Sequence, residues 1–230
     1  TGSYGTVVVT HKHAGLWTDT RYFIQSRKEL EGSEFVMHPL RVPDAVDYPE
    51  WMAANLKHGA VVGIDGECLT YRETEHLKQV LKPLKAGIEN RPSFLNAIWD
   101  DRPGLPLNPV FILEEKYSGK NTGEKLLRLR SQIKAQECTH ILLNSLDQIA
   151  WLFNIRCHDI PYNPVAISYA LADEENATLF ITPGKISDNV KQVLHEQGVS
   201  VMPYDSISGI LKSLPAQTRI MADGNTLNYN

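Results

Sequence analysis

The sequence predicts an α/β protein built from two similar domains, and three observations support this prediction. Short apolar runs rich in β-branched residues alternate with stretches whose apolar residues recur at helical spacing. A proline-rich segment divides the 230-residue chain near its middle. The elements on the two sides of that segment follow one another in the same order, which indicates an internal repeat.

The apolar runs predict strands, and helical patterns lie between most of them. The clearest helix, Thr122–Ala135, carries Leu126, Leu129 and Ile133 on one face, and a second helix is expected over Ser187–Gln197. The alternation of the two element types predicts layers of helix on sheet. The predicted strands are Val7–Val9, Val61–Ile64, Val110–Leu113, Ile141–Leu143, Leu179–Ile181 and Ile220–Ala222.

The boundary between the domains is placed in the proline-rich segment. Arg102–Pro109 contains three prolines and one glycine, a composition that neither a helix interior nor a central strand tolerates. The predicted domains are therefore residues 1–103 and 104–230.

The repeat is clearest where Asp65–Tyr71 is compared with Asp223–Tyr229, because the two segments share Asp, Gly, Leu and Tyr in register. Each copy is preceded by a hairpin, a helix, a strand, a second helix and a strand that ends in Asp-Gly. The paired hairpins are Thr6–Thr18 and Ile167–Thr182, and the paired strands after them are Phe35–Met37 and Val199–Met202.

The repeat also leads to an expectation about the two ends of the chain. The second domain has a long stretch before its hairpin that the first domain lacks, and the first continues beyond Tyr71 through a helix over Arg72–Leu84. We therefore expect the first domain to be truncated at its N-terminal side and the second at its C-terminal side.

Composition excludes several functional classes. With 42% hydrophobic and 22% charged residues the chain is of the ordinary globular type, and no apolar run approaches the ~20 residues of a membrane helix. The net charge is −4 and the basic residues are scattered, so neither nucleic acid nor a membrane is an expected partner. Three widely separated cysteines fit reduced thiols and a cytoplasmic location better than a disulfide framework.

Arg21 is the first candidate functional residue. Asp19 is suited to cap the helix that follows, which places Arg21 in the first helical turn, where a cation opposes the helix dipole. One interpretation is a surface arginine paired with a nearby carboxylate. The other is a guanidinium that grips a peptide carboxylate or carbonyl through its planar set of donors.

A second candidate region is the polar, proline-bearing loop that follows Trp151, Leu152 and Phe153. Side chains of this kind can line a catalytic cleft, but more often they hydrogen-bond loop backbone and fix its path. Within the same loop, Cys157 and His158 could act as nucleophile and base, although adjacent side chains rarely face each other. The polar residues concerned are Asn154, Arg156, Asp159 and Asn163.

A search for metal ligands finds no zinc-type pattern and no His-Glu-x-x-His helix. His11 and His13 fall in the turn of the predicted hairpin, where a solvated loop is the simpler interpretation. The remaining histidines, His38 among them, are isolated in the sequence. The residues alone therefore predict no catalytic centre and no metal site in this chain.

Several motifs, in the order in which they occur, resemble the Xaa-Pro aminopeptidases, the aminopeptidase P branch of the creatinase family. The run Trp-Leu-Phe-Asn-x-Arg followed by Tyr-Asn-Pro-Val is typical of the long, three-domain enzymes. Two residues depart from the family pattern, because Thr20 and Cys157 each replace a glycine. The matching segments are Gly2–Thr6, Trp17–Phe23, Ile98–Pro103, Ala150–Arg156, Asp159–Val165 and Ser168–Ala170.

The resemblance implies two creatinase N-terminal-like domains, each a mixed sheet flanked by helices, followed in the family by a pita-bread catalytic domain. That third domain holds two manganese ions with residues that this chain does not contain. We therefore expect no cofactor in this chain. The activity expected of the full-length protein is the release of an N-terminal residue that precedes proline. Within the chain, Arg21 matches the peptide-binding arginine of the family.

The resemblance also implies partners and an alternative. The expected partners are peptides with proline at the second position and, in the full-length protein, a second copy in a homodimer. The portion encoded here would shape substrate access and assembly without catalysis. A catalytically inactive module of the same fold that binds peptide or protein is the alternative, and creatinase-like chemistry without a metal fits the Trp-Leu-Phe-Asn-x-Arg run less well.

Overall fold

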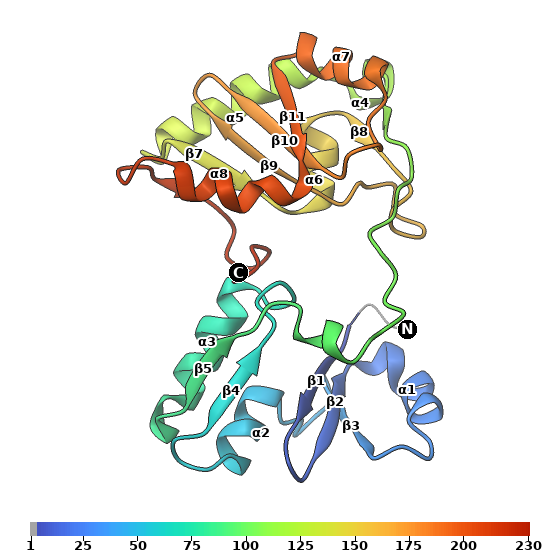
Figure 1. Ribbon diagram of the computed structural model, residues 1–230, viewed down its shortest axis with the longest axis vertical. Helices are drawn as coiled ribbons and strands as arrows, with labels where there is room; N and C mark the ends of the chain where they lie inside the picture. Colours follow the sequence, from blue (N-terminus) through green and yellow to red (C-terminus); the bar gives the residue numbers. More distant parts are fainter. Residues whose placement is uncertain (1–3) are drawn as a thin grey trace. The chain divides into compact units, whose positions relative to one another are not determined.

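The computed structural model describes residues 4–230, which form two compact units: unit 1 comprises residues 4–92 together with Asn230, and unit 2 comprises Ser93–Tyr229. Both units combine helices with strands, as Figure 1 shows, so the predicted α/β class is confirmed. Residues 2 and 3 of the Gly2–Thr6 motif lie outside the described part of the chain. Residues 102–110 have no regular secondary structure, and the boundary after Pro103 stays a prediction.

Unit 1 contains two small sheets. In the first, β1 pairs antiparallel with β2, which pairs parallel with β3. In the second, β4 pairs parallel with β5. The strands are β1 (Thr6–Val9), β2 (Ala14–Thr18), β3 (Phe35–Pro39), β4 (Val61–Ile64) and β5 (Gly87–Asn90), and the helices are α1 (Phe23–Glu29), α2 (Tyr48–Asn55) and α3 (Tyr71–Leu81).

Unit 2 is built on one five-stranded mixed sheet in the order β11-β10-β9-β7-β12, with a two-stranded ribbon of β6 and β8 beside it. The strands are β6 (Phe111–Ile112), β7 (His140–Leu143), β8 (Ile155–Arg156), β9 (Ser168–Asp173), β10 (Ala177–Ile181), β11 (Val199–Pro203) and β12 (Ile220–Met221). The helices are α4 (Glu115–Ser118), α5 (Thr122–Ala135), α6 (Leu146–Leu152), α7 (Asp188–Glu196) and α8 (Ile207–Ser213).

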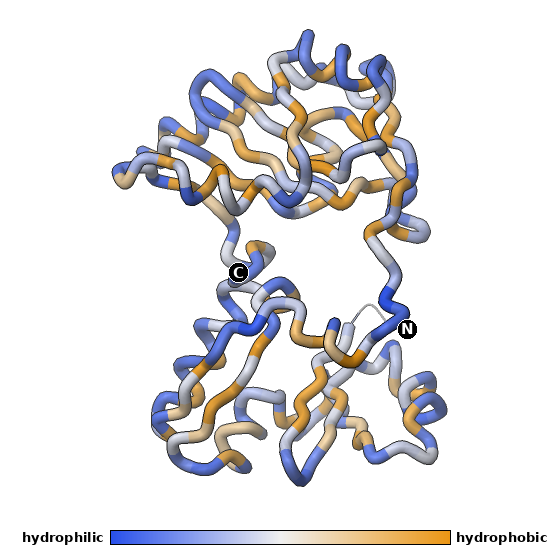
Figure 2. The backbone as a smooth tube through the Cα atoms, viewed as in Figure 1, coloured by the Kyte–Doolittle hydropathy of each residue, from blue (hydrophilic) through white to orange (hydrophobic). Residues whose placement is uncertain are grey.

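The core of unit 2 lies on both faces of this sheet. Ala170, Ala172 and Leu179 face the buried side chains of α5, α6 and α7. On the other face, Leu171 and Phe180 pack against apolar residues of α8. Apolar residues therefore follow one another along the strands, which is why the strands are mostly hydrophobic in Figure 2 while loops and outer helix turns are hydrophilic.

The long helices begin where the sequence offers capping boxes. Asn121 accepts a hydrogen bond from the backbone of Glu124 at 3.0 Å, and the Glu124 carboxylate accepts one from the backbone of Asn121 at 3.2 Å. Thr70 and Glu73 make the same reciprocal pair at the start of α3. These contacts satisfy amides that the helix itself leaves without partners. The predicted helix Thr122–Ala135 is confirmed with the same bounds.

The structure confirms the internal repeat. In both units a hairpin leads into a helix, a parallel strand, a second helix and a further strand that ends in Asp-Gly. The two Asp-Gly turns have the same geometry, because the Asp65 carboxylate accepts from the backbone of Glu67 at 3.0 Å and Asp223 accepts from the backbone of Asn225 at 2.9 Å. The aspartate that both repeats share therefore fixes the turn with its own side chain.

Beneath α2, the core of unit 1 contains a cluster of histidine and tryptophan. His38 stacks on Trp17 with ring centroids 3.9 Å apart, and the Nε2 atoms of His13 and His38 lie 2.9 Å apart. Trp51 of α2 lies over His13 at 4.6 Å. The expectations that His38 is isolated and His13 solvated are wrong, because strand pairing brings together rings that lie 25 residues apart in the sequence.

This cluster predicts a pH-sensitive stability of unit 1. Burial, followed by the nearby His13, lowers the pKa of His38 below the ordinary histidine value. The unfolded chain therefore binds more protons as the pH falls below about 6.5, so stability is fully present above that value and is lost as the pH falls through the folded pKa. We expect the melting temperature of unit 1 to fall between pH 7 and pH 5.

The substitution His38→Met tests this prediction, because methionine is the residue at the equivalent position, Met202, of unit 2. The variant should lose most of the pH dependence, measured by calorimetry at several pH values. His58→Gln, at an exposed loop position, is the matched control and should keep the dependence of the unsubstituted protein. If the melting temperature of His38→Met falls with pH as steeply as that of the unsubstituted protein, the prediction is contradicted.

Candidate functional site

Arg21 lies where the hairpin of unit 1 passes into its first helix. β2 ends at Thr18, Asp19 caps the short 3₁₀ turn Thr20–Tyr22, and α1 follows directly. The Asp19 carboxylate accepts a hydrogen bond from the backbone of Arg21 at 3.2 Å. Asp19 is therefore the helix cap that the sequence predicts, and Arg21 stands in the first turn.

The Asp19 carboxylate is buried and holds two arginines. Arg21 donates to it through Nε at 3.0 Å and Nη2 at 2.8 Å, and Arg41 Nη1 lies 3.5 Å from the same carboxylate. The hydrogen bonds from the Arg21 side chain lower the pKa of Asp19 below its ordinary value, in spite of its burial. We call Asp19, Arg21 and Arg41 the arginine cluster, whose net charge is +1.

The arginine cluster is open to solvent on its cationic side. The Arg21 side chain remains 55% exposed and that of Arg41 64% exposed, whereas Asp19 is 1% exposed. Arg41 also lies over the ring of Tyr4 at 5.1 Å. The contacts of Arg21 with Asp19 use Nε and Nη2, so Nη1 is the part of its guanidinium that Asp19 does not engage. This arrangement suits a carboxylate or carbonyl ligand.

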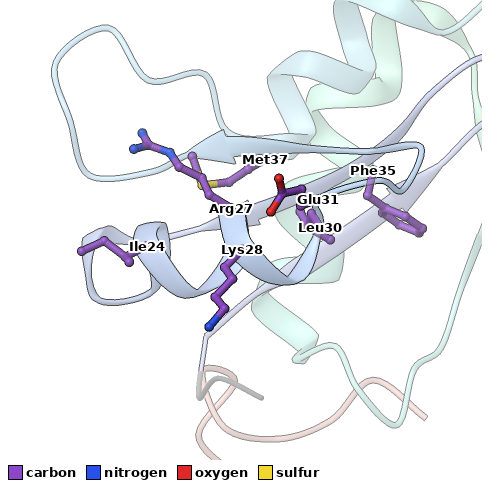
Figure 3. A pocket seen from close by; sticks show the side chains of 7 residues that line it. All are labelled: Ile24, Arg27, Lys28, Leu30, Glu31, Phe35 and Met37. Atoms are coloured by element: carbon purple, nitrogen blue, oxygen red, sulfur yellow. The ribbon is translucent and has the colours of Figure 1, made fainter.

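Two hollows lie near α1. One, of about 230 Å³, is adjacent to the arginine cluster and is lined by Tyr4, Thr18 and Tyr22 among others. The larger one, of about 630 Å³, lies between α1 and β3 and is shown in Figure 3. Its lining is mixed, with Ile24 and Phe35 beside Arg27, Lys28 and Glu31, and none of the residues of the arginine cluster contributes to it.

The polar loop after α6 serves the fold. Arg156 donates to the backbone oxygens of Ala150 and Ile155 at 2.7 and 2.8 Å, and Asp159 accepts from the backbone of Ile167 at 2.8 Å. These contacts confirm for Arg156 and Asp159 the interpretation that such side chains fix the path of the loop.

Asn154 has the same kind of role. It adopts a left-handed conformation, with φ of 52°, directly after the last turn of α6, where asparagine is one of the residues that tolerate it. Its side chain binds the backbone oxygen of Lys120 at 2.8 Å and the buried ammonium group of Lys125. Lys125 also donates to the backbone oxygen of Trp151 at 2.6 Å. The Trp-Leu-Phe-Asn motif is therefore a helix end held by a buried lysine.

Cys157 and His158 do not form a nucleophile–base pair. Cys157 is fully buried and donates to the backbone oxygen of Asn108 at 3.2 Å, whereas His158 is exposed. Burial, with the hydrogen bond to Asp159, raises the pKa of the Cys157 thiol, which favours the unreactive protonated form. Beside this thiol, Asp159 pairs with Lys185, and both side chains are at most 1% exposed.

Three of the cationic side chains described in this section cannot be identified as paired or buried from the sequence alone. Arg41, Lys125 and Lys185 carry no local signal, because lysine and arginine are normally surface residues and their partners here lie far away in the sequence.

Among residues 4–230 there is no group of three or more histidine, cysteine or carboxylate side chains that could hold a metal ion. No helix in the same range is both long and apolar enough to cross a membrane.

Comparison with known proteins assigns both units. The family model of the creatinase/prolidase N-terminal domain matches residues 1–89, and a second model with the same description matches residues 101–230. The chain belongs to the creatinase/prolidase N-terminal domain family. This confirms the fold class and the resemblance, because two such domains account for both units.

The relatives of these creatinase-type domains are aminopeptidases. The chain is 40% identical over 215 residues to the probable Xaa-Pro aminopeptidase P of Neurospora crassa, which covers 90% of this chain and 31% of that protein. It is 37% identical to aminopeptidase P2 of Arabidopsis thaliana, covering 99% of this chain and 32% of that protein. The chain thus spans about a third of the length of these relatives.

A solved structure supports the same relation. X-prolyl aminopeptidase from Caenorhabditis elegans, described as a cytosolic enzyme with a di-nuclear active site, is 33% identical to this chain with a TM-score of 0.91. The match covers 99% of this chain and 38% of the nematode protein. The backbone that carries Arg21 therefore has a close counterpart in an aminopeptidase, while the role of Arg21 as a peptide contact stays a prediction.

The Asp159–Lys185 pair yields a prediction about stability. Lys185→Met should destabilise unit 2 by about 3–5 kcal/mol, because it leaves a buried carboxylate without its cation. Amide exchange of the core strand β10, or urea unfolding followed by circular dichroism, measures this change. The double variant Lys185→Met/Asp159→Leu should recover much of the loss, since no buried charge remains. A loss of less than about 1 kcal/mol in the single variant would contradict the expectation.

Proposed function

We propose that this chain is the non-catalytic N-terminal portion of a metal-dependent Xaa-Pro aminopeptidase that releases N-terminal residues preceding proline. In this proposal the two creatinase-type units shape the access of peptides to a catalytic domain and take part in the assembly of a cytoplasmic homodimer. The observation that carries the proposal is the match of 99% of this chain to 38% of an X-prolyl aminopeptidase. Both units correspond to one part of a larger enzyme.

The metal belongs to the portion of the enzyme that this chain does not cover. Residues 4–230 offer no cluster of metal-binding side chains, so we assign no metal to them. Two manganese ions in the catalytic domain are expected from the resemblance, and the di-nuclear site of the nematode enzyme supports a metal-dependent reaction. Two metal ions would activate a water molecule and polarise the peptide carbonyl.

The part proposed for this chain's own residues is recognition. A peptide substrate presents carbonyl and carboxylate oxygens, and the arginine cluster presents an exposed guanidinium oriented by a buried carboxylate. Because Asp19 holds Arg21 through two nitrogens, the guanidinium is oriented before the peptide arrives, which reduces the entropy lost on binding. Arg21 thus acts as a positioning contact and takes no part in bond cleavage.

The alternative function is a peptide- or protein-binding module of the same fold without catalysis. The exposed guanidinium of Arg21 serves such a module equally well. The two functions differ in the remainder of the protein, where the enzyme requires a ligand set of two Asp, one His and two Glu residues. Detection of peptide binding together with absence of this set and of turnover would favour the module.

The proposed function predicts that residues 1–230 alone are inactive. An Xaa-Pro peptide incubated with the purified chain and Mn²⁺ should be left intact, as judged by release of the free N-terminal amino acid. The longer protein that carries the catalytic domain is the positive control. Robust, chelator-sensitive turnover by the 230-residue chain would overturn the assignment of catalysis to another domain.

The proposed function also yields a prediction about Arg21 in the enzyme that contains both this chain and its catalytic domain. Arg21→Lys should lower kcat/KM for Xaa-Pro peptides about tenfold, because lysine keeps the charge but loses the directed second donor. The melting temperature should change little, because lysine keeps a cation beside the buried Asp19 carboxylate and Arg41 still lies 3.5 Å from it. Steady-state kinetics with a series of peptide lengths measures the effect.

Arg72→Lys is the matched control, because Arg72 also lies exposed in the first turn of a helix, α3. It should leave kcat/KM unchanged. If Arg21→Lys and Arg72→Lys behave alike, Arg21 has no role in peptide recognition. If Arg21→Lys lowers the melting temperature together with kcat/KM, its role is to stabilise the fold.

A further inference from the structure

Arg41 is a cation that the fold places beside another cation. The loop that carries it is tied to the end of β2, because the backbone amide of Leu40 donates to the backbone oxygen of Thr18 at 2.8 Å. Asp19 comes directly after Thr18. Arg21 Nη2 lies 2.8 Å from the Oδ2 atom of Asp19, and Arg41 Nη1 lies 3.5 Å from the same atom. Two guanidinium groups therefore meet at one carboxylate oxygen.

This arrangement of Arg41 is unfavourable for the fold in two respects. Two like charges at one carboxylate repel each other, and one positive charge stays uncompensated. Within the part of the chain that the structure describes, Asp19 is the only carboxylate in an ion pair with Arg41. The backbone of Arg41 also adopts a left-handed conformation, with φ of 58°, which is strained for a residue that has a β-carbon. Strain that the fold maintains in this way points to a functional role.

The guanidinium of Arg41 also differs from those that serve the fold. Arg130 and Arg156 each donate to two backbone oxygens and so fix the path of the chain. Arg41 has no such bond within residues 4–230, since 3.5 Å to Asp19 is longer than an ordinary hydrogen bond. Its other contact is the ring of Tyr4, which lies against the guanidinium with the centroid at 5.1 Å. The N–H groups of Arg41 therefore remain for a ligand, and the side chain is 64% exposed.

The number of guanidinium groups selects the chemistry of the ligand. A peptide carbonyl has one oxygen and no charge, so a single arginine such as Arg21 is enough to bind it. A carboxylate has two oxygens and one negative charge. It can accept from both guanidinium groups and compensates the positive charge that Asp19 leaves over. The arginine cluster as a whole is therefore matched to a carboxylate.

We propose that Arg41, together with Arg21, binds the C-terminal carboxylate of a short peptide substrate and distinguishes it from a C-terminal amide. This inference rests on the proposed function, in which the N-terminal end of the peptide is held where it is cleaved. The C-terminal carboxylate is then the anion that every unmodified peptide still presents, whatever its sequence. Arg41 is a specificity residue and takes no part in bond cleavage.

The test uses the full-length enzyme and pairs of peptides that differ only at the C-terminus. Each pair begins with Ala-Pro, is extended by alanine from tripeptide to hexapeptide, and ends in a carboxylate or an amide. At the length that reaches the arginine cluster, kcat/KM should be about tenfold higher for the acid than for the amide, mainly through a lower KM. Arg41→Gln should bring this ratio close to one, because glutamine has no charge and fewer donors.

The matched control is Arg91→Gln. Arg91 is likewise exposed in unit 1 and paired with a carboxylate, that of Glu89. This variant should keep the acid-to-amide ratio of the unsubstituted enzyme, and Arg41→Lys should keep an intermediate ratio because the charge remains. Melting temperatures report the stability of each variant. No preference for the acid at any length, or an Arg41→Gln enzyme that keeps the full preference, would overturn the inference.

The same assay separates this inference from the proposed function. Cleavage of either member of a pair by the unsubstituted full-length enzyme supports the proposed function whatever the ratio. If neither is cleaved, the proposed function fails, and binding of Ala-Pro-Ala to the 230-residue chain decides the inference. A saturable shift of the Arg41 Nε–H signal in NMR spectra with the acid but not with the amide would support it. Equal shifts, or no shift with either peptide, would overturn it.

Discussion

The pairing of β7 on both of its edges is the interaction on which unit 2 depends. This strand joins the hairpin of β9 and β10 to β12, and it contributes Ile141 to one face of the sheet and Leu142 to the other. β9 pairs with all four residues of β7 and β12 with its first two, so the strand is hydrogen-bonded on both edges while its side chains serve two cores. Unit 1 shows the other case, in which the same hairpin and the same Asp-Gly strand form two sheets.

Much of the fold could be predicted because its signals are local. Apolar spacing predicts helix α5 with its observed bounds, and the position of Asp19 before a helix predicts its role as cap. The repeat could be recognised because Asp65 and Asp223 fix a turn through contacts within two residues. Long-range contacts leave no such pattern. The His13–His38 contact and the buried Lys125 depend on partners 25 and 29 residues away.

The candidate site was predictable in position but not in composition. The sequence is compatible with an Arg21 that pairs with a carboxylate or with one that is free to bind peptide, and in the structure the two alternatives do not exclude each other. Asp19 engages Nε and Nη2 of Arg21 while more than half of the side chain stays exposed. Arg41 escaped notice because it reaches Asp19 from a loop after β3, with a left-handed φ of 58° that no local motif announces.

Both repeats carry a cation in the connection between the hairpin and the helix that follows it, two residues after the helix cap in unit 1 and two residues before it in unit 2, and they use it differently. In unit 1 the helix cap Asp19 directly follows β2, so Arg21 remains at the surface. In unit 2 residues 182–186 intervene between β10 and the cap Ser187, and within this longer connection Lys185 turns inward to Asp159. A pair buried in this way is not accessible to a ligand from solvent, and removing either partner leaves an unpaired charge. In the function proposed above, recognition of an anionic or carbonyl group is assigned to unit 1, because its short connection keeps the Arg21 guanidinium oriented and accessible.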